Sequence, residues 1–455
     1  MPHSVDSNQR PNIICVAIDR LHIGHIGAYG NAWVRTPALD QLAAESLVLD
    51  RAVIDSPHLE VIYRSLWLGL HALCPNNHES QRQHLATILS QAGWHTALLS
   101  DDRTVASHPL AIPFAERIFV ESSSVRPSSN GNNEIAENAV ETDAAAIFAA
   151  TGNWLEVAQR PFFLWIHTGT LGQIWDAPVE FRRQFVGEDD PPAGSWTNVP
   201  NRILSQNFDP DELLAIVQAY AGQVSLIDQF IYSLLQAIKS TENVENTLIV
   251  CFSPRGFPLG EHSRVGACDD ALYAELVHVP WIIRLPKRIA KPGRLQHLVQ
   301  PADMPYTILD CCNLDADRLL SGVTPSPDNS ATSAGFGRSI LDLLKHERLI
   351  GSELACAVSL PDQKFLATIA WSLRLSDNSI QQKHLGENAT SHQSVPRAEL
   401  FAKPDDWFEV NEISNLCPNI AEAMQTALNQ FTAACQTGLP ATLAKLGDEL
   451  TNRCD

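Results

Sequence analysis

The segment Ser253–His262 brings a serine, an arginine, an acid and a histidine together in one short stretch. It follows the apolar run Asn246–Phe252, which predicts a buried parallel strand, and ligand sites in open α/β sheets lie at the carboxyl ends of such strands. Pro254 has no donor atom and Arg255 carries a permanent positive charge, whereas calcium and magnesium bind oxygen ligands. The segment is therefore expected to face a site without holding a cation through these two residues.

A second candidate lies at the end of Pro11–Asp19, a nearly continuous apolar run that predicts a central strand. The Asp19 carboxylate could bind a divalent cation, but the adjacent Arg20 would repel that cation. At about 4 Å and an effective dielectric near 20, two unit charges interact by about 4 kcal/mol, so one guanidinium can offset the attraction of one carboxylate. In the other interpretation, Asp19 is paired with Arg20 or Arg255.

Alternating strands and helices are expected to position these residues. A helix over His84–Gly93 precedes a strand over Trp94–Leu99, and the strand Pro161–His167 ends at a third candidate, His167. This alternation predicts an α/β fold with a doubly wound, mostly parallel sheet over residues 11–345. The other elements expected in this region are a helix with Thr36 as N-cap and Pro37 as its first residue, a long helix over Pro210–Lys239, a strand over Val279–Arg284 and a helix beginning at Asp303.

The pattern changes after about Lys345, where strands follow one another without intervening helices. Such an order predicts an antiparallel sheet, here in a small α+β subdomain over residues 346–455. A surface loop is expected between Glu121 and Glu137, where serine, asparagine, proline and glycine dominate. The C-terminal elements expected are strands over Leu354–Leu360, Phe365–Leu375 and Glu399–Ala402, a turn at Pro361-Asp362 and a helix over Ile420–Ala434.

The composition of the 455 residues, 45% hydrophobic and 18% charged, is that of a globular protein. A net charge of −20 argues against nucleic acid as a partner, because phosphate contacts need clustered lysine and arginine. The polar N-terminus and the lack of an 18-residue apolar stretch predict a cytoplasmic protein without a membrane segment. The ten cysteines include no C-x-x-C pair, so reduced, mostly buried thiols are expected.

Together with Ser253–His262, several segments resemble landmarks of the sulfatase family, within the alkaline phosphatase superfamily, in the family's order. These segments are Asn12–Asp19, Gly27–Asn31, Thr36–Ala43 and Leu276–Ile283. The resemblance covers almost the whole chain. It implies the parallel-sheet fold with a small C-terminal subdomain, and an enzyme that cleaves sulfate esters with a divalent cation.

The resemblance also shows which family positions have changed. Relatives carry two successive aspartates after the first strand and Ser-Asp-His-Gly or Ser-Asp-Asn-Gly in the later loop, so the implied cation ligands align with Asp19, Arg20, Pro254 and Arg255. Only Asp19 keeps an oxygen ligand. The implied cation site is therefore expected to be vacant.

The nucleophile position has changed as well. In relatives a Cys or Ser in C/S-x-P-S-R is oxidised to formylglycine, and that motif aligns with Leu59–Tyr63, where no residue can become an aldehyde or attack as an alkoxide. Ser56 and Ser65 flank the motif without the proline and arginine context that maturation requires. Arg64 follows the usual arginine position by one residue, as a structural or anion-binding side chain.

The acid–base and sulfate-contacting positions complete the pattern. Relatives place a histidine five residues after the one that aligns with His167, and that position is Gly172 here; the sulfate-contacting lysine aligns with Ala267. Glycine transfers no proton and alanine stabilises no developing charge. What remains of the family pattern includes Trp175, Asp176, Pro178, Gly260, Glu261 and His262, which a fold can retain for turns and packing.

Two hypotheses remain. In the first, the protein does not catalyse and uses an anion- or partner-binding cleft, with Arg20, Arg64 and Arg255 as anion-binding residues and no cofactor; the ligand would be a sulfate- or phosphate-bearing small molecule or a protein. In the second, it is an active sulfuric or phosphoric ester hydrolase that uses calcium or magnesium. The cleft is expected to gather Asp19, Arg20, Leu59, Arg64, His167, Arg255 and His262, with Arg64, His167 and His262 as the candidates for chemistry and Asp19 as the one metal ligand.

Overall fold

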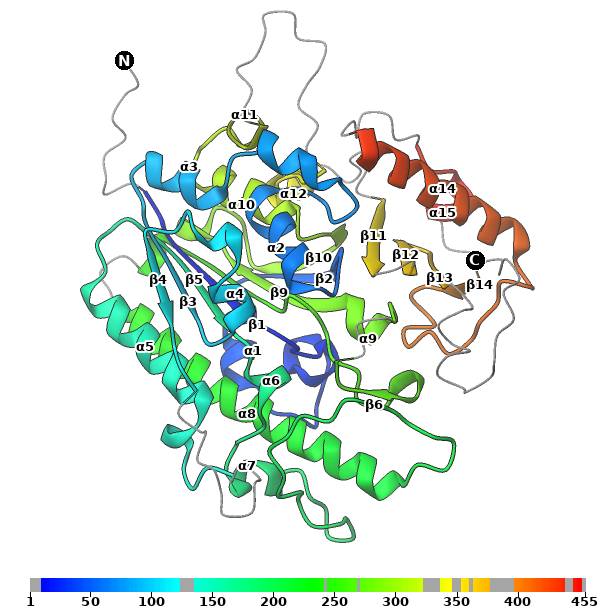
Figure 1. Ribbon diagram of the computed structural model, residues 1–455, viewed down its shortest axis with the longest axis horizontal. Helices are drawn as coiled ribbons and strands as arrows, with labels where there is room; N and C mark the ends of the chain where they lie inside the picture. The colour runs from blue at the N-terminus through cyan, green and yellow to red at the C-terminus, as the bar shows by residue number, and fades with distance from the viewer. Residues whose placement is uncertain are drawn as a thin grey trace, which may run out of the picture.

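The computed structural model describes residues 10–122, 135–240, 244–267, 271–321, 336–345, 353–359, 363–376, 397–437 and 445–451 (Figure 1). Its largest feature is an eight-stranded sheet with the strand order β10-β2-β9-β7-β1-β5-β3-β4. These strands are β1 (Asn12–Ile18), β2 (Leu47–Val53), β3 (His95–Ser100), β4 (Glu116–Phe119), β5 (Phe162–Thr168), β7 (Thr247–Phe252), β9 (His278–Arg284) and β10 (Gly293–Val299).

β1 is central, as its uninterrupted apolar sequence predicted. It pairs in parallel with β5 on one side and with β7 on the other, and all seven of its residues are buried. Only β9 runs antiparallel to its neighbours β7 and β2. The predicted α/β class with a mostly parallel sheet is confirmed.

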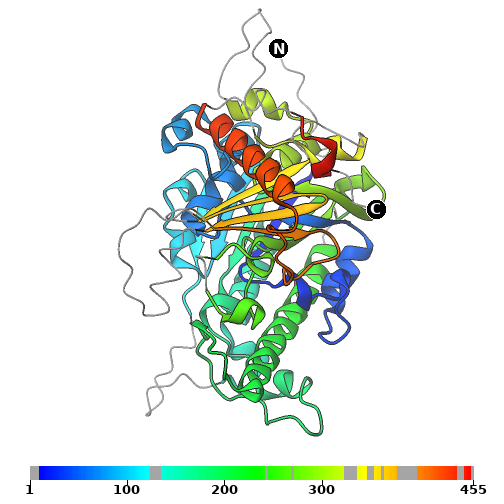
Figure 2. The ribbon, with the colours of Figure 1, turned by 90° about the vertical axis from the view of Figure 1, so that its right-hand side faces the viewer.

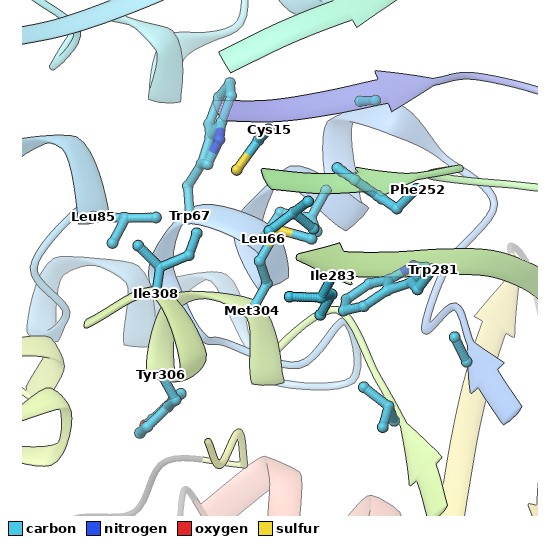
Figure 3. Packing of buried hydrophobic residues seen from close by; sticks show 14 of the residues in the cluster. Cys15, Leu66, Trp67, Leu85, Phe252, Trp281, Ile283, Met304, Tyr306 and Ile308 are labelled. Atoms are coloured by element: carbon cyan, nitrogen blue, oxygen red, sulfur yellow. The ribbon is translucent and has the colours of Figure 1, made fainter. Parts of the chain in front are cut away.

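Both faces of this sheet are covered, so the fold is doubly wound. Alternate residues of β1 enter two separate cores: Ile13 and Cys15 join one, and Ile14 and Val16 join the other. Figure 3 shows the first core, where Cys15, Trp67 and Trp281 lie together. The helices of that face include α2 (Leu59–Leu68), α3 (Leu85–Gln91) and α10 (Asp303–Cys311), and the opposite face carries α1 (Pro37–Ala44), α5 (Asp143–Val157) and the long α8 (Pro210–Lys239).

The start of α1 differs from the sequence-based prediction. Thr36 occupies the N-cap position, but its side chain makes no capping hydrogen bond to the helix. The carboxylate of Asp228 on α8 instead accepts hydrogen bonds from the backbone nitrogens of Ala38 and Leu39, both at 2.9 Å. A distant carboxylate therefore caps α1 and ties it to α8, a contact that local sequence cannot reveal.

The C-terminal part forms a four-stranded antiparallel sheet, crossed by a helix (Figure 2). The prediction of a single strand over Phe365–Leu375 was wrong, because the chain turns between Thr368 and Trp371, where the Thr368 hydroxyl accepts hydrogen bonds from the nitrogens of Ala370 and Trp371. No glycine or proline marks this turn. The elements are β11 (Leu354–Ser359), β12 (Gln363–Thr368), β13 (Trp371–Ser376), β14 (Arg397–Ala402) and α14 (Pro418–Thr437); the turn predicted at Pro361-Asp362 lies outside the described residues.

The two sheets are in contact. The backbone nitrogen of Val358 donates to the Asp55 carbonyl at 2.9 Å, and Phe365 belongs to the same core as Cys15. These contacts do not mark a boundary between two domains, so the predicted division of the chain at residue 345 stays a prediction. The remaining helices and strands are α4 (Arg103–Ala106), β6 (Arg202–Ile203), α6 (Thr170–Gln173), α7 (Val179–Arg183), β8 (Arg264–Val265), α9 (Ala274–Val277), α11 (Ala316–Ser321), α12 (Ile340–Lys345) and α15 (Asp448–Thr451).

Within the described ranges, no helix combines the length and the apolar character that crossing a membrane requires. The eight cysteines in those ranges are free thiols, seven of them buried, in line with the predicted reduced, buried state. Most of the loop predicted between Glu121 and Glu137 lies outside the described residues.

Candidate functional site

Three adjacent parallel strands deliver polar residues to one edge of the large sheet. Asp19 directly follows β1, His167 is the penultimate residue of β5, and Arg255 lies three residues beyond the end of β7. Backbone hydrogen bonds join the strand ends: the nitrogen of Asp19 donates to the Thr168 carbonyl at 2.9 Å. The structure thus brings these three side chains to the carboxyl ends of the strands.

The central interaction is a bidentate ion pair between Arg255 and Asp19. Arg255 Nε lies 2.9 Å from Asp19 Oδ1, and Nη2 lies 3.0 Å from Oδ2. The third guanidinium nitrogen, Nη1, donates to the Pro57 carbonyl at 2.9 Å. Asp19 is 2% exposed and the Arg255 side chain 14%, so both carboxylate oxygens already hold a cationic partner inside the protein.

Arg20 adds a second positive charge to this pair. Its Nε lies 4.0 Å from Asp19 Oδ2, and its backbone nitrogen donates to the Arg255 carbonyl at 3.0 Å. Burial alone would raise the pKa of the Asp19 carboxyl, but the charges of Arg255 and then Arg20 outweigh that effect and lower the pKa. Asp19 therefore stays ionised beside the two guanidinium groups.

Gly172, at the position of the family's histidine, lies against the stem of Arg20. A Cβ atom at residue 172 would come within 2.9 Å of Arg20 Cγ. Arg20 is 2% exposed and has a backbone φ of 66°, so it cannot swing out without changing the strand end. The absence of a side chain at Gly172 and the presence of Arg20 are thus parts of one packing arrangement.

This contact gives a testable prediction. Gly172→Ala is expected to destabilise the protein by about 1–3 kcal/mol, because the added methyl overpacks a buried side chain. Urea denaturation measures the difference. Adding Arg20→Gly, which removes the obstructing stem and suits the positive φ, should return part of the loss; equal stability of Gly172→Ala and the parent protein would contradict the argument.

His167 is buried beside this cluster and pairs with Tyr63 of α2. Its Nδ1 lies 2.6 Å from the Tyr63 hydroxyl, and the histidine is completely buried. Burial lowers the pKa of His167, so the ring is neutral at physiological pH, while burial raises the pKa of Tyr63. Sequence reasoning missed Tyr63, although its place four residues after Leu59 puts the two on neighbouring turns of one helix face.

The position of the family's nucleophile offers no reactive side chain. Leu59 is the first residue of α2 and is buried, close to the Pro57 carbonyl that binds Arg255. The flanking serines have other partners: Ser56 Oγ accepts from the nitrogen of His58, and Ser65 Oγ contacts the Asp55 carboxylate and the Leu70 carbonyl.

The Arg64 side chain has partners outside the Asp19 cluster, whereas the sequence predicted that it lines the cleft. Its Nη2 donates to the Cys74 carbonyl at 3.0 Å, and its Nε lies 2.5 Å from Glu79 Oε1. The reason is helical geometry, since five residues after Leu59 turn the side chain by about 140° away from it. Arg64 therefore contacts the segment after α2, through Cys74 and Glu79.

His262 is also absent from the Asp19 cluster. Its Nδ1 lies 3.0 Å from Glu275 Oε1, and its Nε2 lies 3.0 Å from the Glu409 carbonyl. His262 has a backbone φ of 51°, and the preceding Gly260 one of 120°. This left-handed turn directs the His262 ring toward the C-terminal sheet. Sequence reasoning did not predict the positive φ of His262 and therefore placed the ring in the cleft.

A further acid, the partly buried Asp101, lies at the same sheet edge and was missed by sequence reasoning. Its Oδ1 accepts from the nitrogen of Gly169 at 2.7 Å, and its Oδ2 accepts from the Thr168 hydroxyl at 2.8 Å. Burial raises the pKa of Asp101 to about 7. The pair Asp101-Asp102 directly after a predicted strand was the signal that could have located it.

The donor set does not fit a divalent cation. Across the ranges that the structure describes, no three His, Cys, Asp or Glu side chains gather closely enough to hold a metal ion. At this edge Asp19 faces two guanidinium groups, whereas calcium and magnesium need several oxygen ligands. Ala267, at the position of the sulfate-contacting lysine, is exposed and carries no charge.

Comparison with known proteins gives a consistent result. A family model described as Sulfatase matches residues 11–314. A Δ4,5-hexuronate-2-O-sulfatase of Bacteroides thetaiotaomicron is 21% identical over 369 residues, covering 71% of this chain and 73% of that protein.

Solved structures show the same fold at low identity. A phosphonate monoester hydrolase of Agrobacterium radiobacter has a TM-score of 0.71 and 15% identity, covering 94% of this chain and 96% of its own. A protein solved in complex with its substrate D-glucosamine-2-N,6-O-disulfate has a TM-score of 0.65 and 16% identity, covering 94% and 98%.

Proposed function

This chain belongs to the sulfatase family, and from that premise we propose that it is a non-catalytic member that binds a sulfate- or phosphate-bearing ligand. The observation that carries the proposal is the ion pair between Arg255 and Asp19. A guanidinium takes up both oxygens of the one carboxylate that remains from the implied cation site. An internal, permanently charged side chain thus replaces an exchangeable metal ion.

The other parts of a hydrolytic site are missing at the same edge. Leu59 supplies no nucleophile, Gly172 supplies no proton, and His167 is completely buried with its Nδ1 bonded to Tyr63. Nucleophile, cation and proton donor act as one unit in catalysis, so their combined loss is not repaired by a single neighbour. These observations support the absence of turnover.

Anion binding is supported by the two guanidinium groups of the cluster. Arg20 and Arg255 both lie beside Asp19 at the strand ends, in a chain whose net charge is −20. Arg255 is the more exposed of the two arginines, with 14% of its side chain accessible against 3% for Arg20, and its guanidinium nitrogens contact Asp19 and the Pro57 carbonyl. A sulfate or phosphate group would therefore share this guanidinium with Asp19.

The alternative hypothesis is an active ester hydrolase with an atypical site, and two of the residues predicted for that site have other partners. It needed Arg64 and His262 beside Asp19, and the structure gives both side chains other partners. Its remaining candidates are His167, which is buried, and Asp19, which is engaged by Arg255.

The test measures metal content, turnover and ligand binding on one purified sample. We expect no stoichiometric calcium or magnesium, no hydrolysis of aryl sulfate or phosphonate monoester above the buffer blank, and a melting temperature that rises with sulfate concentration. Arg202→Ala, which changes an exposed arginine paired with Glu212, serves as the control for general salt effects. Turnover by the unaltered protein would overturn the proposal in favour of the hydrolase.

A further inference from the structure

A buried group of charged and aromatic side chains joins the loop after β7 to the C-terminal sheet. We call it the His262 junction and define it by His262, Tyr273, Glu275, Arg374 and Glu409, with Lys403 and Glu399 at its edge. His262, Tyr273 and Glu275 come from the segment after β7; the others come from β13, β14 and the chain after β14. Its members therefore lie on both sides of the contact between the two parts.

The hydrogen bonds of His262 define its protonation state. Nδ1 lies 3.0 Å from a carboxylate oxygen of Glu275, and Nε2 lies 3.0 Å from the backbone carbonyl of Glu409. Both partners are acceptors, and a backbone carbonyl can never donate. Beside an ionised Glu275, both ring nitrogens carry a hydrogen, so the geometry favours an imidazolium cation.

The aromatic ring of Tyr273 adds a second contact that favours a cation. The His262 and Tyr273 rings are stacked with centroids 3.7 Å apart and planes at 8°, and Arg374 Cζ lies 3.8 Å from the Tyr273 ring centroid. A cation held against an aromatic ring is attracted by the negative face of the ring. Arg374 also donates to the Tyr273 hydroxyl at 2.6 Å.

Glu409 ties the C-terminal side together. Its side chain is buried, accepts hydrogen bonds from Ser372 Oγ at 2.8 Å and from the nitrogen of Ala274 at 3.1 Å, and forms an ion pair with Lys403 Nζ at 3.1 Å. Glu409 contacts the loop twice, through its carboxylate to the nitrogen of Ala274 and through its backbone carbonyl to His262. Because the carboxylate also binds Ser372 of β13, this one residue connects the loop to the sheet.

Several acids and bases surround His262 in the junction. The acids are Glu275, Glu399 and Glu409, and the bases beside His262 are Arg374 and Lys403. Arg264 acts on Tyr273 from β8, and the half-exposed Arg397 lies 3.4 Å from Glu399 on the solvent side. Burial alone would lower the pKa of His262, but the hydrogen bond and charge of Glu275 outweigh it and raise the pKa.

We propose that His262 carries a structural proton that fastens the C-terminal sheet to the loop after β7, and that losing this proton loosens the contact. A pKa raised in the folded state contributes stability that is fully present below the unfolded value of about 6.5 and is lost as pH rises through the folded value. The junction is therefore a pH-sensitive contact between the loop after β7 and the C-terminal sheet. This inference is independent of whether the chain hydrolyses esters.

The experiment follows amide hydrogen exchange of β13 and β14 between pH 6 and pH 9, corrected for intrinsic exchange. Protection of these strands should fall across this range, by about tenfold for each unit by which the folded pKa of His262 exceeds 6.5. His262→Gln should have low protection at both pH values, because a neutral amide cannot replace the cation. NMR of the His262 ring gives its titration directly, and Glu275→Gln should lower that pKa.

His58→Gln is the matched control. His58 also links the two parts, with its Nε2 3.1 Å from the hydroxyl of Ser359 on β11, but a hydroxyl can donate or accept and so needs no charged ring. We expect this variant to keep the pH dependence of the parent protein. A His262 that titrates at or below 6.5, or a His262→Gln variant with the same pH-dependent protection as the parent, would overturn the proposal.

Discussion

Arg255→Met is expected to lower the free energy of unfolding by about 3–5 kcal/mol, because it leaves the buried Asp19 carboxylate without its principal partner. Asp19 is 2% exposed, and Arg255 supplies two of its hydrogen bonds. A buried carboxylate that keeps only the more distant Arg20 cannot recover the lost hydrogen bonds from water. Urea denaturation followed by circular dichroism at neutral pH measures the loss.

Two controls separate this effect from general damage. Asp19→Asn in the Arg255→Met background removes the stranded charge and should return a substantial part of the lost stability. Arg202→Ala breaks an ion pair whose partners are 41% and 47% exposed, and should change stability by no more than about 1 kcal/mol. A loss as small for Arg255→Met as for Arg202→Ala would show that the Asp19 pair has no structural importance.

The second large effect is a gain of cation affinity without a gain of catalysis. The triple variant Arg20→Asp, Pro254→Asp, Arg255→His replaces two positive charges and a side chain without donors by three groups that can ligate a metal ion. We expect calcium or magnesium to bind the variant and to stabilise it by about 2.7 kcal/mol at a hundredfold excess over Kd. Calorimetric titration and thermal denaturation measure binding.

Hydrolysis should stay at the level of the blank in this variant. Leu59 remains at the nucleophile position and Gly172 remains without a proton to transfer, so a bound cation has no attacking group to assist. Adding Asp19→Asn should weaken cation binding, which shows that the ion sits at this edge. Failure of the triple variant to bind either cation while still folded would mean that the strand ends no longer have the geometry of a cation site.

Sequence reasoning located the sheet and half of the site. Continuous apolar strands such as β1 are strong signals, and residues placed directly after them, such as Asp19, are fixed in space by the parallel pairing itself. Arg255 follows β7 in the same way. That is why their proximity was predictable although 236 positions separate them.

The failures have specific physical causes. Arg64 was placed by alignment with a motif, whereas the rotation of α2 carries it to the far side of the helix. His262 lies in a turn with positive φ, which redirects a side chain in a way that residue type does not reveal. The division of Phe365–Leu375 depends on a threonine hydroxyl that binds two backbone nitrogens, a weak turn signal without glycine or proline.

The contact between Gly172 and Arg20 has a consequence for the order in which substitutions can occur. A histidine at 172 is obstructed while Arg20 is present, and Arg255 partners Asp19 where a cation would otherwise be needed. Each position constrains the others, so a single substitution toward the family's residue at one of them is expected to cost stability. Under the proposed non-catalytic function, a path back to an active site would have to cross several destabilised intermediates.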